Sequence, residues 1–306
     1  MKHNRLTELH AVYILHVMAS RLSIARADII KALEQIPPVV RQRDLGKLLE
    51  QNRAFWRLTL STSLAEFIEF LLDSTKLRKV HLSLPHRPET LYVWGEVSSL
   101  VVASSAKPGA YLCHYTAMHL HELTDQVPKT IYANFEQRPI PPSDTPPTQA
   151  SIDAAFRRTQ RLTTNVCPLG DQRLCMINGK NTRRLGVEER KDDHGLTFSV
   201  TGLERTLIDI TVRPAYAGGV SEVLEAYRRA ASRVSLNKLS GMLKKMEFVY
   251  PYHQAIGFYL EHSRAYEPSR IELFRARPFE FDFYLTYAMK NTEYSPRWRI
   301  HFPAGL

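Results

Sequence analysis

The sequence predicts an α+β protein of two domains, in which a helical amino-terminal region ending in a β-hairpin precedes a larger mixed α/β domain. The first observation is length, because 306 residues exceed what one small module needs. The second is composition: 44% hydrophobic and 24% charged residues allow a sizeable core. The third is pattern, because helical periodicity comes first and short β-type segments alternate with helices afterwards.

The amino-terminal region shows repeated helical spacing of apolar residues. One helix is expected to start after a Ser/Thr-rich segment, since Ser63 is followed three residues later by Glu66, which is the capping-box pattern. Its apolar residues lie on one broad stripe from Leu64 to Leu72. We expect helices over residues 6–18, 23–35, 43–55 and from 64 onward.

Two β-type segments, residues 77–82 and 90–95, flank a proline-containing turn and predict a hairpin. Helix, short turn, helix and hairpin is the order of a winged helix-turn-helix. We therefore predict a winged helix-turn-helix DNA-binding module within residues 1–100. A winged helix that serves structure or protein contacts is the alternative.

Hydroxyl and cationic side chains of this module are the candidate DNA contacts, because a helix N-terminus and basic groups both favour phosphate. Against this, the helix also carries Glu66, Glu69 and Asp73, which would repel phosphate if they faced DNA. The candidates are Arg53, Arg57, Thr59, Ser61, Thr62 and Ser63 near the helix start, and Arg78, Lys79, His86 and Arg87 in the hairpin.

The second domain is expected to span residues 101–306 and to contain a proline-rich loop at 139–147. Asn178-Gly179 is a strong hairpin-turn signal. Expected helices cover residues 110–123, 152–161, 202–213, 219–231, 235–246 and 252–261, and expected strands cover 129–134, 173–177, 185–188, 196–200, 279–287 and 298–302.

The helix over residues 202–213 has charged residues among apolar ones and ends before Pro214, which cannot continue a helix. Buried charges need partners, so Glu204, Arg205 and Asp209 predict a structural network. A metal-dependent nuclease is the alternative for this pair of carboxylates. Glu204 and Asp209 are about 140° apart around a helix, however, and no further ligand motif accompanies them.

Other residues suggest neither a disulfide framework nor a metal site. Three cysteines are few and odd in number, which favours buried, reduced thiols in a cytoplasmic protein. His114, His119 and His121 lack the spacing of a zinc motif, so packing and hydrogen bonding are expected of them instead. We expect no cofactor, no metal and no membrane association.

A net charge of +10 raises the expectation of a polyanionic partner. Within the second domain, basic side chains form a possible secondary surface, for which solvated loops are the alternative. They are Arg157, Arg158 and Arg161 on a short helix, and Lys180, Arg183 and Arg184 in a predicted basic hairpin.

The segment from Thr201 to Asp209 resembles the T-x-x-E-R-T-L-I-D signature of AbiEi-type antitoxins, the transcription-regulating partners in type IV toxin–antitoxin systems. Residues 111–123 are similar to a second family element, although Cys113, Met118 and Glu122 depart from it, and residues 249–261 are similar to its closing helix. The resemblance covers about residues 40–265.

This resemblance implies a non-enzymatic repressor that binds double-stranded DNA at its own promoter. It also implies an antitoxin whose second domain counters a nucleotidyltransferase-type toxin without a stable complex. A homodimer or cooperative DNA binding is compatible with this function. The two alternatives are an enzyme that processes nucleic acid and a protein-interaction adaptor.

Overall fold

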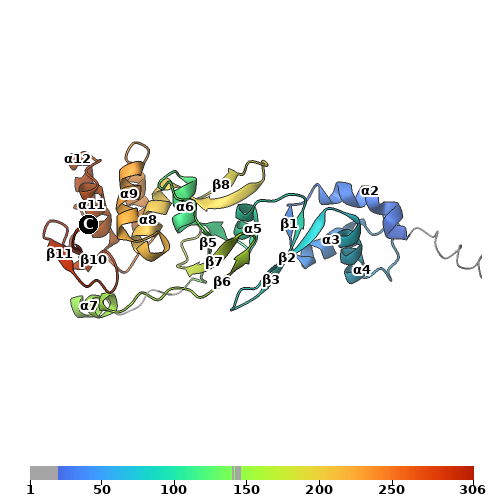
Figure 1. The fold of residues 1–306 in the computed structure, drawn as a ribbon, viewed down its shortest axis with the longest axis horizontal. Coiled ribbons are helices and arrows are strands. Elements are labelled where there is room, and N and C mark those ends of the chain that lie inside the picture. The colour runs from blue at the N-terminus through green and yellow to red at the C-terminus, as the bar shows by residue number, and fades with distance from the viewer. Residues whose placement is uncertain (1–19, 140, 142–145) are drawn as a thin grey trace, which may run out of the picture. The chain divides into compact units, whose positions relative to one another are not determined.

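The protein, described as a computed structural model for residues 20–139, 141 and 146–306, is a mixed α+β protein with three sheets (Figure 1). The expected helix at 6–18 lies outside the described residues. The described residues form two compact units: 20–81 with Glu89–Val97, and Leu82–Pro88 with the described residues from Ser98 to Leu306. The expected domain boundary at residue 100 falls inside helix α5 (Ser99–Ser105), which belongs to the second unit.

From residue 20 onward, the first unit contains three helices and a small sheet of order β1-β3-β2, in which β1 and β3 are antiparallel. Its core is aliphatic with an aromatic pair, Trp56 and Phe67, whose ring centroids lie 5.8 Å apart. The elements are α2 (Arg21–Leu33), β1 (Val39–Val40), α3 (Gln42–Asn52), α4 (Leu64–Ser74), β2 (Leu77–Leu82) and β3 (Glu89–Trp94).

The second unit has a six-stranded mixed sheet of order β6-β7-β5-β4-β9-β8, in which β5 pairs with β7 and β4 with β9 in parallel. A smaller sheet has the order β10-β12-β11. The strands are β4 (Tyr111–Leu112), β5 (Thr130–Glu136), β6 (Val166–Leu169), β7 (Gln172–Gly179), β8 (Val187–Lys191), β9 (Thr197–Thr201), β10 (Phe283–Tyr284), β11 (Thr292–Ser295) and β12 (Ile300–Pro303).

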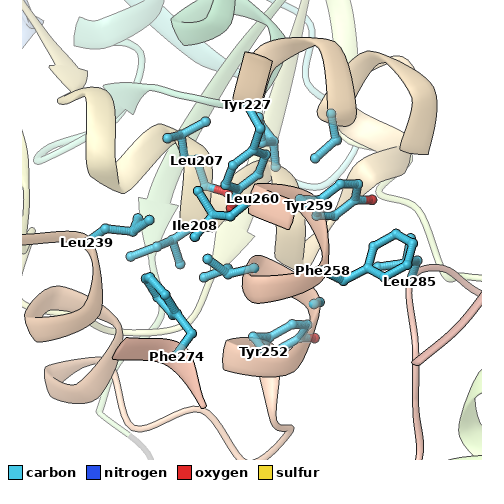
Figure 2. Packing of buried hydrophobic residues seen from close by; sticks show 14 of the residues in the cluster. Leu207, Ile208, Tyr227, Leu239, Tyr252, Phe258, Tyr259, Leu260, Phe274 and Leu285 are labelled. Atoms are coloured by element: carbon cyan, nitrogen blue, oxygen red, sulfur yellow. Dashed lines mark hydrogen bonds between the residues drawn. The ribbon is translucent and has the colours of Figure 1, made fainter. Parts of the chain in front are cut away.

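Helices of the second unit pack around a large apolar core, part of which Figure 2 shows. Tyr227 and Tyr259 stack at 5.3 Å, and Gly257 leaves room for the fully buried Trp298. The helices are α5, α6 (His114–Leu120), α7 (Gln149–Arg157), α8 (Leu203–Val212), α9 (Val220–Ala230), α10 (Leu236–Lys245), α11 (Tyr252–His262) and α12 (Pro268–Ile271).

Several sequence predictions in the second unit are wrong. Residues 111–112 form the short strand β4 instead of the start of a helix. Asn178 and Gly179 end β7 instead of forming a hairpin turn, because the Asn134 side chain accepts the Gly179 N–H and keeps the strand paired with β5. The predicted basic hairpin is therefore a loop, residues 180–186, that connects β7 to the non-adjacent β8. Arg158 and Arg161 lie beyond α7.

None of the helices in the described part of the chain has the length and apolar character needed to cross a bilayer.

Candidate nucleic-acid interface

The turn between α3 and α4 contains most of the predicted DNA contacts of the first unit. Arg57, Thr59, Ser61 and Ser63 are exposed there, whereas Thr62 is buried. The Thr59 and Ser61 hydroxyl oxygens lie 2.7 Å apart. Exposed hydroxyls beside an exposed arginine can bind phosphate oxygens.

Ser63 is the N-cap of α4, and its Oγ accepts the Glu66 N–H at 3.1 Å, as the capping pattern predicts. The positive end of the helix dipole lies at this terminus and favours anions there.

Arg53, which is predicted to contact DNA, is bonded within the protein. Its Nη1 donates to the carbonyls of Thr59 at 2.7 Å and Thr62 at 3.1 Å, and its Nη2 pairs with Glu50 at 2.5 Å. Only 13% of the Arg53 side chain is exposed. Arg53 therefore positions the turn, and the exposed Arg57 is the cation that the turn presents.

The exposed face of α4 is acidic, because Glu66, Glu69 and Asp73 are exposed along it. Arg78 and Lys79 are exposed on β2. Arg57 thus precedes α4 in the chain, Arg78 and Lys79 follow it, and α4 itself contains no cationic residue.

His86 and Arg87 are exposed in the turn between β2 and β3. Residues Leu82–Pro88 group with the second unit, so the structure does not assign these two side chains to the same surface as Arg57.

In the second unit, Arg205 is the centre of a buried polar cluster. Its Nε donates to Asp209 at 2.8 Å, and these side chains are 4% and 10% exposed. Nη1 donates to the Thr182 hydroxyl at 2.9 Å and to the Leu185 carbonyl at 2.5 Å, while Nη2 donates to the Tyr111 hydroxyl at 3.1 Å. Burial raises the pKa of Asp209 by more than the neighbouring guanidinium lowers it.

Glu136 extends this cluster to the loop at 180–186. Its carboxylate accepts the Thr182 and Arg184 N–H groups at 3.0 and 3.1 Å, and also the hydroxyls of Thr182 and Tyr111. Burial alone would raise the pKa of Glu136, but these hydrogen bonds lower it below its ordinary value. The cluster therefore fixes the loop to the sheet.

Glu204 does not belong to this cluster, which corrects the predicted network of three residues. It pairs with Lys238 at 2.7 Å and accepts the Ser235 N–H at 3.1 Å. Although burial opposes it, this bonding lowers the pKa of Glu204. The two carboxylates, Glu204 and Asp209, thus serve separate structural contacts and do not converge on one point.

Cys113 and His114 are buried beside the cluster, with Sγ and Nδ1 3.1 Å apart. Burial, assisted by Arg213 and Arg205, lowers the pKa of His114 to about 3. Burial also raises the pKa of the Cys113 thiol. A neutral imidazole and a protonated thiol result, and neither is exposed to solvent.

The other cysteines, Cys167 and Cys175, are also buried and free. His121 Nε2 lies 2.8 Å from the Thr201 carbonyl oxygen and its Nδ1 lies 2.9 Å from Arg190 Nη2. Among the described residues, no group of three or more His, Cys, Asp or Glu side chains is arranged to hold a metal ion.

The predicted secondary basic surface is divided in the structure. Lys180 and Arg183 line a hollow of about 1150 Å³. Arg184 is directed inward, where its Nη2 donates to Ser199 at 3.0 Å and its guanidinium carbon lies 5.6 Å from the Tyr111 ring centroid. Arg157, Arg158 and Arg161 are exposed on and after α7 and are not among the described residues lining this hollow.

Gly186 fixes the end of the same loop. Its φ of 74° lies in the left-handed region, and a Cβ there would lie 2.8 Å from the Met242 sulfur and 2.9 Å from the Arg205 Cβ. Its carbonyl accepts the Gly202 N–H at 2.8 Å. Only glycine fits this position without a shift of its neighbours.

Sequence reasoning missed Tyr111 and Thr182, which accept hydrogen bonds from Arg205, and Asn134 and Glu136, which hydrogen-bond to Tyr111. They come from separate strands and a loop, so no local spacing indicates them. The predicted strand at 129–134 contains Asn134 but stops before Glu136. The observed strand β5 continues to Glu136, so the two side chains, two residues apart, share one face of the sheet.

No family model and no curated protein matches the chain. The chain is similar to a solved structure, the RV2827C protein from Mycobacterium tuberculosis, with 17% sequence identity and a TM-score of 0.53. The similarity covers 91% of this chain and 90% of that chain. At this identity it shows a shared fold alone.

Proposed function

We propose that the protein is a non-enzymatic, sequence-specific DNA-binding repressor of its own promoter and an antitoxin against a nucleotidyltransferase-type toxin in the cytoplasm. The observation that supports DNA binding is the order of the first unit: helix, short strand, two helices and two strands, with the sheet order β1-β3-β2. This order is compatible with a winged helix, and the proposal takes α4 as the recognition helix. The antitoxin part rests on the sequence resemblance.

The exposed residues of the first unit limit how DNA binds. Because Glu69 and Asp73 lie in the later turns of α4 and Glu66 in its first turn, phosphate contacts belong to the turn that precedes the helix and to its N-cap. Arg57 supplies the charge there, and Ser61 and Ser63 supply hydroxyls. Electrostatic repulsion keeps the carboxyl-terminal part of α4 away from the DNA backbone.

Operator binding by the full chain tests this face. Arg57→Ala is expected to weaken binding to the upstream DNA and to reduce the slope of log K against log salt by about 1, since one phosphate contact is lost. Arg26→Ala, on the exposed face of α2, is the matched control. Equal effects of the two substitutions, or no binding by the wild type, would overturn the assignment.

A second variant, which removes a negative charge, tests whether the carboxylates of α4 repel DNA. Glu69→Gln removes one exposed carboxylate from α4 and is expected to strengthen operator binding, whereas Glu34→Gln, just after α2, is expected to leave it unchanged. Weaker binding in Glu69→Gln would show that this carboxylate contacts bases and does not merely repel phosphate.

The antitoxin function is tested separately. Co-expression of the full chain with the nucleotidyltransferase encoded beside it is expected to restore growth, and Arg57→Ala is expected to restore it equally, because this function belongs to the second unit. Absence of such a neighbouring gene, or failure of rescue by the wild type, counts against the antitoxin.

A further inference from the structure

Two hollows in the second unit adjoin at the end of α10. One, of about 440 Å³, is lined by the end of α10, the start of α11 and residues 277–281. The other, of about 1150 Å³, lies against the loop at 180–186 and the same end of α10. Both are lined by Pro147, Glu247 and Val249, so they adjoin there, and we call the two hollows together the basic groove.

Positive charge dominates the basic groove. Among its described lining residues, Glu247 and Glu280 are the only carboxylates. Six cationic side chains stand against them, namely Arg138, Lys180, Arg183, Lys244, Lys245 and Arg277. Lys244 and Lys245 also lie in the last turn of α10. This excess of cations favours a ligand with several negative charges.

Aromatic and apolar side chains alternate with these cations. Phe248, Tyr250 and Phe281 are half-buried in the wall of the smaller hollow, and Val249 is 63% exposed where the two hollows meet. The Lys180 ammonium lies 5.4 Å from the Phe248 ring centroid. Cations that follow a backbone beside aromatic rings that contact bases are typical of sites for single-stranded nucleic acid.

His253 provides a polar group of the right kind in the same hollow. Burial lowers its pKa to about 4, so the ring is neutral at pH 7. The Pro278 backbone favours the protonated ring and partly opposes this shift of the pKa, and the buried Nε2 has no hydrogen-bond partner in the described part of the chain. A neutral imidazole that donates at one nitrogen accepts at the other. Nε2 therefore suits an amino or imino group of a base.

The volume of the groove favours an extended ligand over a small molecule. The larger hollow alone exceeds the roughly 300–1,000 Å³ that usual small-molecule sites occupy. We propose that the basic groove of the second unit binds single-stranded nucleic acid, with phosphates on the lysines and arginines and a base in the aromatic hollow beside His253. This proposal does not depend on duplex binding by the first unit.

Fluorescence anisotropy with the full chain tests it, using labelled oligo(U) and oligo(dT) of about 12 nucleotides. Arg183→Ala and Lys245→Ala, both exposed, are each expected to weaken binding about threefold to tenfold and to reduce the salt slope by about 0.7. Lys191→Ala, exposed on β8 outside the groove, is the matched control.

A second pair of variants avoids any loss of folding. Val249→Glu places a negative charge where the two hollows meet and is expected to weaken binding at least about tenfold, because it repels phosphate. Val249→Thr, of similar shape, is expected to bind like the wild type. Arg57→Ala is expected to leave oligonucleotide binding unchanged, which separates this groove from the operator site.

Preference for oligo(U) or oligo(dT) identifies RNA or DNA as the natural ligand, and either supports the proposal. The proposal is overturned if the protein binds neither oligonucleotide. It is also overturned if Lys191→Ala weakens binding as much as Arg183→Ala and Lys245→Ala do. Competition by poly-glutamate at equal charge overturns it in favour of an acidic protein partner. Binding of a single nucleoside triphosphate as tight as that of the oligonucleotide overturns it in favour of a small-nucleotide site.

Discussion

Both units use an arginine to fix a connecting segment, but the two arginines have different surroundings. Arg53 in the first unit holds a surface turn through the Thr59 and Thr62 carbonyls and pairs with an exposed glutamate. Arg205 in the second unit holds the loop at 180–186 from inside and pairs with the buried Asp209. Water can replace the partners of Arg53, whereas the Arg205–Asp209 pair is buried away from water. The contacts of Arg53 therefore stabilise one surface turn, whereas the contacts of Arg205 stabilise the fold of the second unit.

The largest effect is expected when the buried pair is broken. Arg205→Met leaves the Asp209 carboxylate without its cation and is expected to lower the free energy of unfolding by about 3–5 kcal/mol, measured by urea unfolding. The double variant Arg205→Met/Asp209→Leu is expected to recover most of this loss, because an apolar pair needs no charge partner. A double variant no more stable than the single one would show that the other bonds of Arg205 dominate.

A steric substitution tests whether the core of the second unit is destabilised by added volume as well as by loss of the buried ion pair. At Gly257 on α11, a Cβ would lie 2.0 Å from a carbon of the Trp298 ring, so Gly257→Ala is expected to cost about 1–3 kcal/mol or more of unfolding free energy. Gly241→Ala is the matched control, since nothing lies within 4 Å of its Cβ position on α10 and alanine favours a helix by up to about 1 kcal/mol. Equal effects in thermal unfolding would mean that Trp298 moves freely.

Acid is expected to destabilise the second unit through its neutral histidines. The pKa of His114 is lowered to about 3 and that of His253 to about 4, so the unfolded chain binds these protons first. Their stabilising contribution is complete above about pH 6.5 and is lost as the pH falls towards the folded values, by about 1.4 kcal/mol per pH unit for each group.

Urea unfolding between pH 7.5 and 5 measures this slope, with the pH values set around the ordinary histidine pKa of about 6.5. His114→Asn is expected to reduce it by the contribution of one group, and asparagine tolerates the φ of 49° at this position. An unchanged slope would show that His114 titrates normally.

The smallest effect is expected at the surface turn. Arg53→Ala is expected to lower thermal stability less than Arg205→Met, and to increase hydrogen exchange at residues 59–62, because the side chain no longer holds the Thr59 and Thr62 carbonyls. Operator binding is expected to weaken only through this loosened turn. A loss of salt dependence as large as that in Arg57→Ala would instead show that Arg53 contacts phosphate directly.

Prolines and capping residues predicted correctly the helices and turns whose ends are determined by residues nearby in the sequence. The helix α8 ends before Pro214 as expected, and the hairpin of β2 and β3 has its prolines in the turn. The strand β4 was missed because it has only two residues, which is too short for an alternation of apolar and polar side chains. It is stabilised by pairing with strands on both sides. The end of β7 was missed because a side chain, Asn134, stabilises it from another strand.

The candidate sites divide in the same way. The hydroxyl-rich start of α4 could be predicted because capping is a local interaction. The structural role of Arg53 could not be predicted, because it depends on two carbonyls in the following turn. The separation of Glu204 from Arg205 could not be predicted either, because Glu204 pairs with a lysine on another helix. The basic groove combines a loop with helix ends far apart in the sequence, so only the fold reveals it.

Gly186 has an implication for how this chain can change over evolutionary time. The loop at 180–186 combines surface lysine and arginine residues with a glycine that cannot be replaced without displacing Met242 and Arg205. In related chains we therefore expect the charges at positions 180 and 183 to vary with the ligand, while the residue at 186 stays glycine. Natural variation can then alter what the loop binds without altering where the loop is held.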